Sequence, residues 1–402
     1  MRRTGGDVDG SLRAIEAAAT SRAPIRRSVP VHVGLLVGIV ALINGACSSD
    51  DSPSSATVAP ADPAPESTTG TESDGDEATA QRGGDAPTVE EVTYPSGDLQ
   101  LEGDLHVPAG PGPHPAVTLI HGSGPNSRHA QLPGQLALQF GFAIPVFDEL
   151  AAALSDAGWT VLIYDKRTCG TFNACATNAY PLPDADLTTE AFAADARAGV
   201  DYLRTRSDVD PEAIVVAGHS QGSTFVPSLL ASDPRLRGGI MLAAPYDSVD
   251  QVLADQAAFL SEIIGPAAGD NPAVAQTNEL AAQVACLRAD AAATEVVGGA
   301  SAAFWRAWME AGDAAPSVLA DVTQPVLLLF GGNDWNVPID QAAKWRAATE
   351  GLDHVQLAAI ECITHALNCL AESEPTKITP ADIGRTVDPT VPASLIEFLD
   401  KS

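Results

Sequence analysis

One serine of the chain has neighbours that suit it to nucleophilic chemistry. Ser220 is the middle residue of Gly218-His-Ser-Gln-Gly222, which directly follows the apolar, β-branched run 213–217. A strand, a tight turn and a helix around this pattern expose the serine hydroxyl in a strained turn. The flanking glycines remove Cβ atoms that would clash there. The sequence therefore predicts that Ser220 is a nucleophile and that the N–H of Gln221 donates to an oxyanion.

The serine needs two partners, because a hydroxyl is a poor nucleophile at neutral pH. One partner is a base that takes its proton, and the other is an acid that orients the base. Asp334 and His365 follow the apolar strand-like runs 326–330 and 355–360. The carboxyl ends of parallel strands meet at one edge of a sheet, where such sheets build their sites. We therefore expect Ser220, Asp334 and His365 to form a catalytic triad.

Other residues compete for these roles. Asp247 follows the next strand-like run after Ser220, a position that also suits the acid, although we favour Asp334. His354 precedes its strand, so we expect it at the opposite edge of the sheet, as a surface histidine. Glu361 lies near His365 in the sequence and is expected to be a solvated carboxylate or to lie behind the histidine.

A second oxyanion donor is expected from a glycine-containing loop. His121-Gly-Ser-Gly-Pro125 follows the wholly apolar run 116–120. Its glycines allow the backbone to approach a ligand closely. We choose the N–H of Ser123 as the donor and expect His121 to brace the loop rather than to react.

The charge of the chain excludes some partners. Its 402 residues carry 52 acidic against 22 basic side chains, a formal net charge of −30. Such an excess speaks against binding nucleic acid or anionic lipid headgroups. No Cys-x-x-Cys motif or histidine pair has zinc spacing, so we expect no metal.

The N-terminal residues 1–46 have the pattern of an export signal. Arg26-Arg27 precede an apolar run, 29–46, that ends in small residues. Gly45-Ala46-Cys47 resembles a bacterial lipobox, in which the cysteine is acylated, although Asn44 departs from the usual aliphatic residue. An uncleaved helix remains open, because about 18 apolar residues can just span a bilayer. Plain secretion is the third alternative.

A polar linker separates this signal from the folded domain. Residues 47–86 are rich in Ser, Thr, Pro, Ala, Gly, Asp and Glu and contain almost no large aliphatic side chains. Such a segment cannot bury enough apolar surface to offset chain entropy. We expect a disordered tether over 47–86, a folded domain over 87–402 and, with Cys47 lipidated, a membrane contact through this anchor alone.

The folded domain alternates strand and helix patterns, which predicts a mostly parallel sheet covered by helices on both faces. A hairpin is expected around Ser96-Gly97. An alanine-rich segment of helical spacing, about 246–320, interrupts the alternation and predicts a helical cap over the site. The expected strands are 89–94, 99–107, 116–120, 159–164, 213–217, 239–243, 326–330 and 355–360, and the expected helices are 147–157, 191–204, 341–349 and 393–399.

Five ordered motifs carry a family resemblance over about residues 89–399. The chain resembles bacterial esterases of the α/β-hydrolase superfamily, with their HGSGP oxyanion loop, YDKR strand end, GHSxG elbow and late histidine. The resemblance implies the α/β-hydrolase fold, with the same triad and oxyanion residues. The matching residues are His121–Pro125, Tyr164–Arg167, Gly218–Gly222 with Pro227, Gly332 and Asp334 with Val337-Pro338, and Thr364–Leu367.

The chain departs from this family in two cysteine-containing loops. A segment with Cys169 and Cys175 stands where the family has a glycine-rich turn, and Cys362 and Cys369 flank the histidine. Disulfides are favoured in an exported protein. With Cys47 acylated, pairs 169–175 and 362–369 leave Cys286 free, whereas a bridge to Cys286 remains an alternative because spacing does not fix connectivity.

These patterns together predict an exported, lipid-anchored or secreted serine hydrolase. It would cleave small carboxylic esters through an acyl-enzyme and would need no cofactor. A peptidase or amidase on the same fold is the first alternative. A binding lipoprotein without activity is the second, which the complete triad disfavours. Acyl chain length and oligomeric state are not predicted.

Overall fold

A computed structural model describes most of the chain from Ala86 onward. The predicted export signal, the lipidation residue Cys47 and nearly all of the predicted linker lie outside the described residues. The described residues are 86–132, 142–172, 175, 187–374 and 377–402.

An eight-stranded sheet forms the centre of the fold, in the order β1-β2-β6-β3-β7-β8-β9-β10. β1 and β2 form the predicted hairpin around Gly97, and β2 is also antiparallel to β6. All other neighbouring strands run parallel. The strands are β1 (Thr88–Ser96), β2 (Leu99–Val107), β3 (His114–Ile120), β6 (Thr160–Tyr164), β7 (Val209–His219), β8 (Gly238–Leu242), β9 (Val326–Gly331) and β10 (Val355–Ile360).

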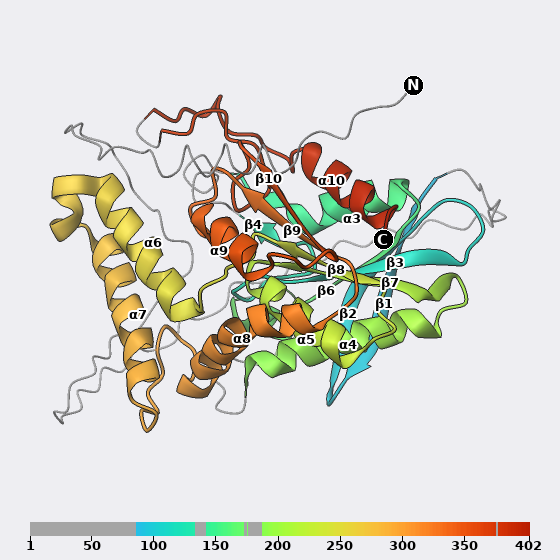
Figure 1. The fold of residues 1–402 in the computed structure, drawn as a ribbon, viewed down its shortest axis with the longest axis horizontal. Coiled ribbons are helices and arrows are strands. Elements are labelled where there is room, and N and C mark those ends of the chain that lie inside the picture. Colours follow the sequence, from blue (N-terminus) through green and yellow to red (C-terminus); the bar gives the residue numbers. More distant parts are fainter. Residues whose placement is uncertain (1–85, 133–141, 173–174, 176–186, 375–376) are drawn as a thin grey trace, which may run out of the picture.

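Helices cover both faces of this sheet (Figure 1). Since the inner strands are buried on both faces, their sequences are continuous apolar runs rather than alternating ones. α4 (Thr189–Thr205), α5 (Val226–Ser232) and α9 (Asp340–Ala348) share one buried cluster, which contains Trp345. α3 (Val146–Asp156) and α10 (Thr390–Leu399) share the cluster on the other face.

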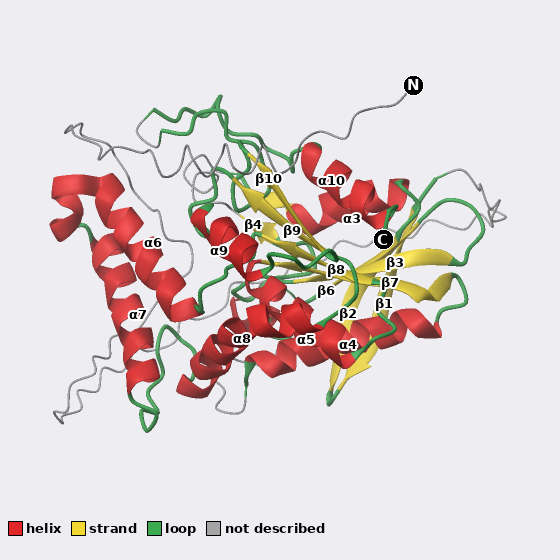
Figure 2. Ribbon diagram, viewed as in Figure 1, coloured by secondary structure: helices red, strands yellow, loops and turns green. Residues whose placement is uncertain are grey.

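The helical insertion predicted after β8 is present. It consists of α6 (Val249–Ile264), a short 3₁₀ segment (Gly265–Asp270), α7 (Pro272–Ala289) and α8 (Ala302–Asp321). α6 and α7 form a helical pair at one side of the molecule, and α8 packs against α4 and α5 (Figures 1 and 2). Asn271 accepts hydrogen bonds from the N–H groups of Ala273 and Val274 and so caps α7.

Most predicted elements differ from the observed ones only at their ends. β7 is longer than predicted and begins at Val209, where Asp210 and Glu212 interrupt the apolar pattern. A two-stranded sheet of β4 (Gln131–Leu132) and β5 (Ile144–Pro145) was not predicted, because strands this short leave no periodic signal. Among the described residues, no helix is both long and apolar enough to cross a membrane.

Candidate active site

The turn after β7 puts Ser220 in the left-handed region, at φ +52°. The residue starts a 3₁₀ segment (Ser220–Phe225) that leads into α5. A Cβ on Gly218 would lie 2.3 Å from the carbonyl oxygen of Gly222, and one on Gly222 would lie 2.3 Å from that of Ile120. Both glycines are therefore required by close backbone approach, as expected for a nucleophile elbow.

The loop after β3 lies against this turn. A Cβ on Gly122 would lie 3.2 Å from the Cβ of Ser220, so the glycine brings the loop backbone next to the serine. Asn126 holds the loop by donating to the carbonyl oxygens of Gly122 and Ser123, at 3.2 and 2.9 Å. The structure thus brings the loop that carries Ser123 beside the turn that carries Ser220 and Gln221.

His121 has the bracing contacts expected of it. Its Nε2 hydrogen-bonds the carbonyl oxygen of Tyr164, and its ring stacks on Phe147 with centroids 4.7 Å apart. Burial lowers the pKa of His121 to about 4, so the ring is neutral at physiological pH. Since a carbonyl only accepts, the Nε2 of His121 carries the proton.

Asp334 and His365 are in direct contact. The Nδ1 of His365 lies 2.8 Å from Oδ2 of Asp334, whose side chain is 1% exposed. The other carboxylate oxygen accepts the backbone N–H groups of Asn336 and Val337, at 2.8 and 2.9 Å. A carboxylate held in this way fixes the ring orientation of its histidine partner and keeps the proton on Nδ1, which leaves Nε2 as the hydrogen-bond acceptor of the ring.

His219 connects the histidine loop to the elbow. Its Nε2 donates to the carbonyl oxygen of His365 at 2.9 Å, and the two rings lie 4.7 Å apart. Burial, together with the neighbouring His365, lowers the pKa of His219 to about 3. His219 is therefore a neutral donor that ties the residue before Ser220 to the main chain of His365.

The loop of His365 is a small, strongly cross-linked unit. A disulfide joins Cys362 to Cys369 with Cα atoms 4.8 Å apart, and Leu370 N–H donates to the carbonyl oxygen of Cys362 at 2.7 Å. Asn333 bonds this loop twice, through its N–H to Ile363 and through its side chain to Leu370. Asn333 precedes Asp334, so one segment orients both the acid and the histidine loop.

The competing residues lie elsewhere. Asp247 accepts hydrogen bonds from Gln341 and Lys344. His354 precedes β10, at the opposite end of that strand from the loop of His365. Glu361 is exposed, as expected for a solvated carboxylate. The observed contacts of His365 favour Asp334 over Asp247 as its acid partner.

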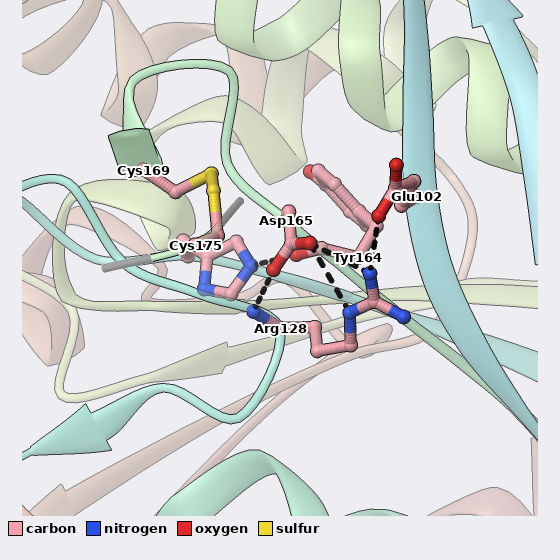
Figure 3. Close-up of a disulfide and its surroundings, with 7 residues drawn as sticks. Glu102, Arg128, Tyr164, Asp165, Cys169 and Cys175 are labelled. Carbon is pink, nitrogen blue, oxygen red and sulfur yellow. Dashed lines mark hydrogen bonds and ion pairs between the residues drawn. A yellow bond between two sulfur atoms is a disulfide. The ribbon is translucent and has the colours of Figure 1, made fainter. Parts of the chain in front are cut away.

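A second disulfide, Cys169–Cys175, closes the segment after β6, with Cα atoms 5.5 Å apart. Cys286 in α7 is unpaired, so the alternative bridge to it is not present. Figure 3 shows the carboxylate of Asp165 between this disulfide and Arg128. Arg128 donates to Asp165 at 2.7 Å and forms a further ion pair with Asp104. This network fixes the end of β6 to the loop after β3.

A cavity of about 580 Å³ lies between α6 and the start of α9. Four of its nine lining residues are acidic, and Lys344 is the one basic residue among the nine. Lys344 forms an ion pair with Asp247, and the nearby Asp340 has a pKa raised by burial. The acidic residues of the lining are Asp247, Asp255, Glu262 and Asp340.

Sequence reasoning assigned no role of their own to Lys166 and Asn333. Both contact the loops of the candidate site through side chains, and their partners lie far away in the sequence. In the sequence, Lys166 belongs to the YDKR strand end. The adjacent glycines gave the one available signal for Asn333, because Gly331 and Gly332 approach the carbonyl oxygens of Ile363 and Glu361.

A mainly parallel sheet with helices on both faces, and a serine in a left-handed turn directly after a central strand, define an α/β hydrolase. The family model described as "Serine aminopeptidase, S33" matches residues 140–372, more than half of the chain. The chain belongs to this family, and it is a hydrolase by class.

Individual relatives share at most about a third of their aligned residues with this chain and match only part of it. Esterase EstD of Thermotoga maritima is 29% identical over 269 residues, which make up 66% of this chain and 58% of that protein. The chain thus spans less than two thirds of that relative's length. An uncharacterized protein of Mycobacterium tuberculosis is 33% identical over 104 residues, 26% of this chain and 32% of that protein.

Among solved structures, an α/β hydrolase named GrgF from Penicillium sp. sh18 superposes with a TM-score of 0.48. It is 14% identical, and the superposition covers 78% of this chain and 98% of that one. The Pyrococcus furiosus esterase Pf2001 gives a TM-score of 0.46 at 16% identity, over 78% and 93% of the two chains.

We expect the Cys362–Cys369 disulfide to stabilise the folded state. A bridge that closes a ring of this size contributes about 2–3 kcal/mol by restricting the unfolded chain. Cys362→Ala/Cys369→Ala should therefore unfold at lower temperature than the parent protein and should lose the sensitivity to reduction that this bridge confers. Thermal melts with and without reductant measure both effects.

Cys286→Ala is the matched control, because that thiol is unpaired. Its melting temperature should stay close to that of the parent. Peptide mapping without reduction tests the bridge directly, and recovery of Cys362 and Cys369 as free alkylated thiols would rule it out.

Proposed function

We propose that the protein is a serine esterase that hydrolyses small carboxylic esters with Ser220, His365 and Asp334. The observation that carries the proposal is the 2.8 Å contact between His365 Nδ1 and the buried Asp334. This contact lies in the loops after β9 and β10, at the same sheet edge as the strained Ser220. The esterase named among the relatives supports the choice of substrate class.

The reaction begins when the Oγ of Ser220 attacks the ester carbonyl carbon while His365 Nε2 takes the hydroxyl proton. The tetrahedral intermediate collapses, and His365 gives this proton to the leaving alcohol, which leaves an acyl group on Ser220. Water then attacks the acyl-enzyme as His365 removes its proton. When the second intermediate collapses, the proton returns to Ser220 and the carboxylic acid leaves.

The negative oxygen of both tetrahedral intermediates requires donors that are already in place. We assign this role to the backbone N–H groups of Ser123 and Gln221. The close approach of Gly122 to Ser220 supports the assignment, because it brings the two backbone segments together. Donors fixed by the fold need no reorganisation when charge develops, which makes them effective in catalysis. The mechanism needs no cofactor from outside the chain.

Amide hydrolysis is the second candidate. The matched family is described as a serine aminopeptidase, and the same steps cleave an amide when the leaving group is an amine. The acidic cavity beside α6 has the sign of charge that attracts a free amino terminus. Full-length protein assayed with p-nitrophenyl esters of graded chain length and with aminoacyl anilides separates the two activities. Faster turnover of the anilides would replace the first proposal by the second.

We further propose that the mature protein is exported and anchored through a lipidated Cys47. The support is the sequence pattern of residues 1–86 alone, which lies outside the described residues. In this arrangement the linker would hold the hydrolase domain away from the membrane, and ester substrates would reach it from outside the cell. Secretion without an anchor remains the alternative.

Ser220→Ala should reduce ester hydrolysis by about 10⁶-fold, because it removes the only proposed nucleophile. Covalent labelling by a fluorophosphonate probe should disappear as well. Ser223→Ala is the control, since its hydroxyl is used in a bond to the carbonyl oxygen of Ser220. Labelling that survives in Ser220→Ala would refute the assignment of the nucleophile.

Asp334→Asn should lower kcat by about 10⁴-fold, because the amide favours the wrong tautomer of His365. Asp247→Asn should have a far smaller effect, since its carboxylate contacts Gln341 and Lys344 instead. Steady-state kinetics of both variants test the assignment. The reverse order of effects would move the acid to the loop after β8.

Cys47→Ser should release active enzyme from the membrane fraction into the soluble fraction, because the proposed anchor is lost while the hydrolase domain is unchanged. Fractionation of cells that express each form, followed by an esterase assay, measures this. Enzyme that stays in the membrane fraction would favour an uncleaved helix.

A further inference from the structure

Lys166 is a buried cation beside the candidate site that the proposed mechanism does not use. It is the second residue after β6 and is 3% exposed. Within the described part of the chain, no carboxylate lies within 4.0 Å of its ammonium group. Burying a charge without an opposite charge is costly, so its polar contacts need an explanation.

The ammonium group of Lys166 instead contacts both halves of the proposed oxyanion hole. Nζ donates to the carbonyl oxygen of Gly122 at 2.6 Å and to Oε1 of Gln221 at 2.9 Å. It also lies 4.3 Å from the ring centroid of Phe192, whose π-face attracts a cation. One side chain thus joins the loop after β3 to the elbow after β7.

The contact with Gly122 acts on the peptide group that holds the first proposed donor. The carbonyl of Gly122 and the N–H of Ser123 belong to the same peptide unit. A cationic donor at the carbonyl oxygen polarises this unit and strengthens the N–H as a hydrogen-bond donor. Through this polarisation of the peptide group, the charge of Lys166 acts on the proposed oxyanion.

The contact with Gln221 holds the side chain of the residue whose backbone N–H is the second proposed donor. The side-chain Nε2 of Gln221 is buried and has no hydrogen-bond partner among the described residues. The bond from Lys166 to Oε1 is consequently the hydrogen bond that orients this amide. Reversing the amide would turn its NH₂ toward the ammonium, so the charge also fixes which way the side chain points.

We propose that Lys166 is a positioning residue of the oxyanion hole, which fixes the Gly122–Ser123 peptide and Gln221 relative to each other and strengthens the N–H of Ser123 with its charge. This inference rests on the proposed serine esterase mechanism.

The charge of Lys166 responds to the reaction. Burial lowers the pKa of Lys166 to about 7, and Asp195 partly opposes this effect. A negative charge developing on the substrate oxygen favours the ammonium form and so raises this pKa again. Lys166 therefore interacts more strongly with the transition state than with the bound ester, which is the condition for raising kcat rather than lowering KM.

The test compares Lys166→Met with Lys401→Met in the full-length protein. Methionine keeps most of the side-chain length and removes the charge, and Lys401 is a lysine that pairs with Glu397 of α10 instead. In Lys166→Met, kcat for p-nitrophenyl acetate should fall by about 10–100-fold, less than for loss of an oxyanion donor itself. KM should change by less than about threefold. Lys401→Met should keep the parent kcat.

A trifluoromethyl ketone gives a readout that a general loss of stability would not change. It adds to the serine as a tetrahedral oxyanion, so its Ki should rise in Lys166→Met by the same factor as kcat falls. Gln221→Met removes one acceptor of Lys166 and keeps the backbone N–H. It should show a smaller loss of kcat at unchanged KM, and the double variant should be less impaired than the product of the two effects.

The outcomes separate this inference from the proposed function. A kcat within twofold of the parent in Lys166→Met, or an unchanged Ki, would overturn the role of Lys166. If Lys166→Met does not fold, Gln221→Met decides, and an unchanged kcat there would overturn it. A parent protein that neither hydrolyses esters nor reacts at Ser220 would instead overturn the proposed function.

Discussion

The left-handed backbone of Ser220 is the constraint on which the rest of the site depends. This conformation costs of order 1–3 kcal/mol for a residue other than glycine, so the surrounding structure must impose it. It does so by close packing of backbone on backbone, since a Cβ on Gly222 would lie 2.3 Å from the carbonyl oxygen of Ile120. The same packing joins the end of β3 to the turn of Ser220, so the strained serine and the adjacent loop of the proposed oxyanion hole have one structural cause.

The two buried histidines near the turn of Ser220, His121 and His219, are neutral because burial disfavours the charged ring. Burial lowers the pKa of His121 to about 4 and that of His219 to about 3, and each ring donates to a main-chain carbonyl. His365 differs from them, because its side chain is 17% exposed and bonds a carboxylate. Three histidines close together thus have two separate uses. His121 and His219 support the backbone without titrating near neutrality, whereas His365 contacts Asp334, its partner in the proposed triad.

Much of this arrangement was predictable because its signals are local. The strands are apolar runs, and the residues at their carboxyl ends are Ser220, Asp334 and His365, so the sheet alone brings these three to one edge. The contacts of Asn333 and Lys166 were not predictable, since each joins segments that are distant in sequence. The choice between Asp334 and Asp247 also depended on side-chain contacts. No sequence spacing records the bond of Asp247 to Lys344.

The excess of acidic residues makes it notable that the ammonium group of Lys166 has no carboxylate partner among the described residues. With 52 acidic and 22 basic side chains, a buried cation in this chain has many carboxylates available as partners. Asp165, the residue before Lys166, pairs with Arg128, and Arg167, the residue after it, pairs with Asp195. Each of these arginines neutralises the carboxylate nearest to it, which leaves the ammonium of Lys166 to donate to Gly122 and Gln221. In the proposed mechanism, the ion pairs on either side therefore leave this ammonium group to act on the two segments that would hold the oxyanion.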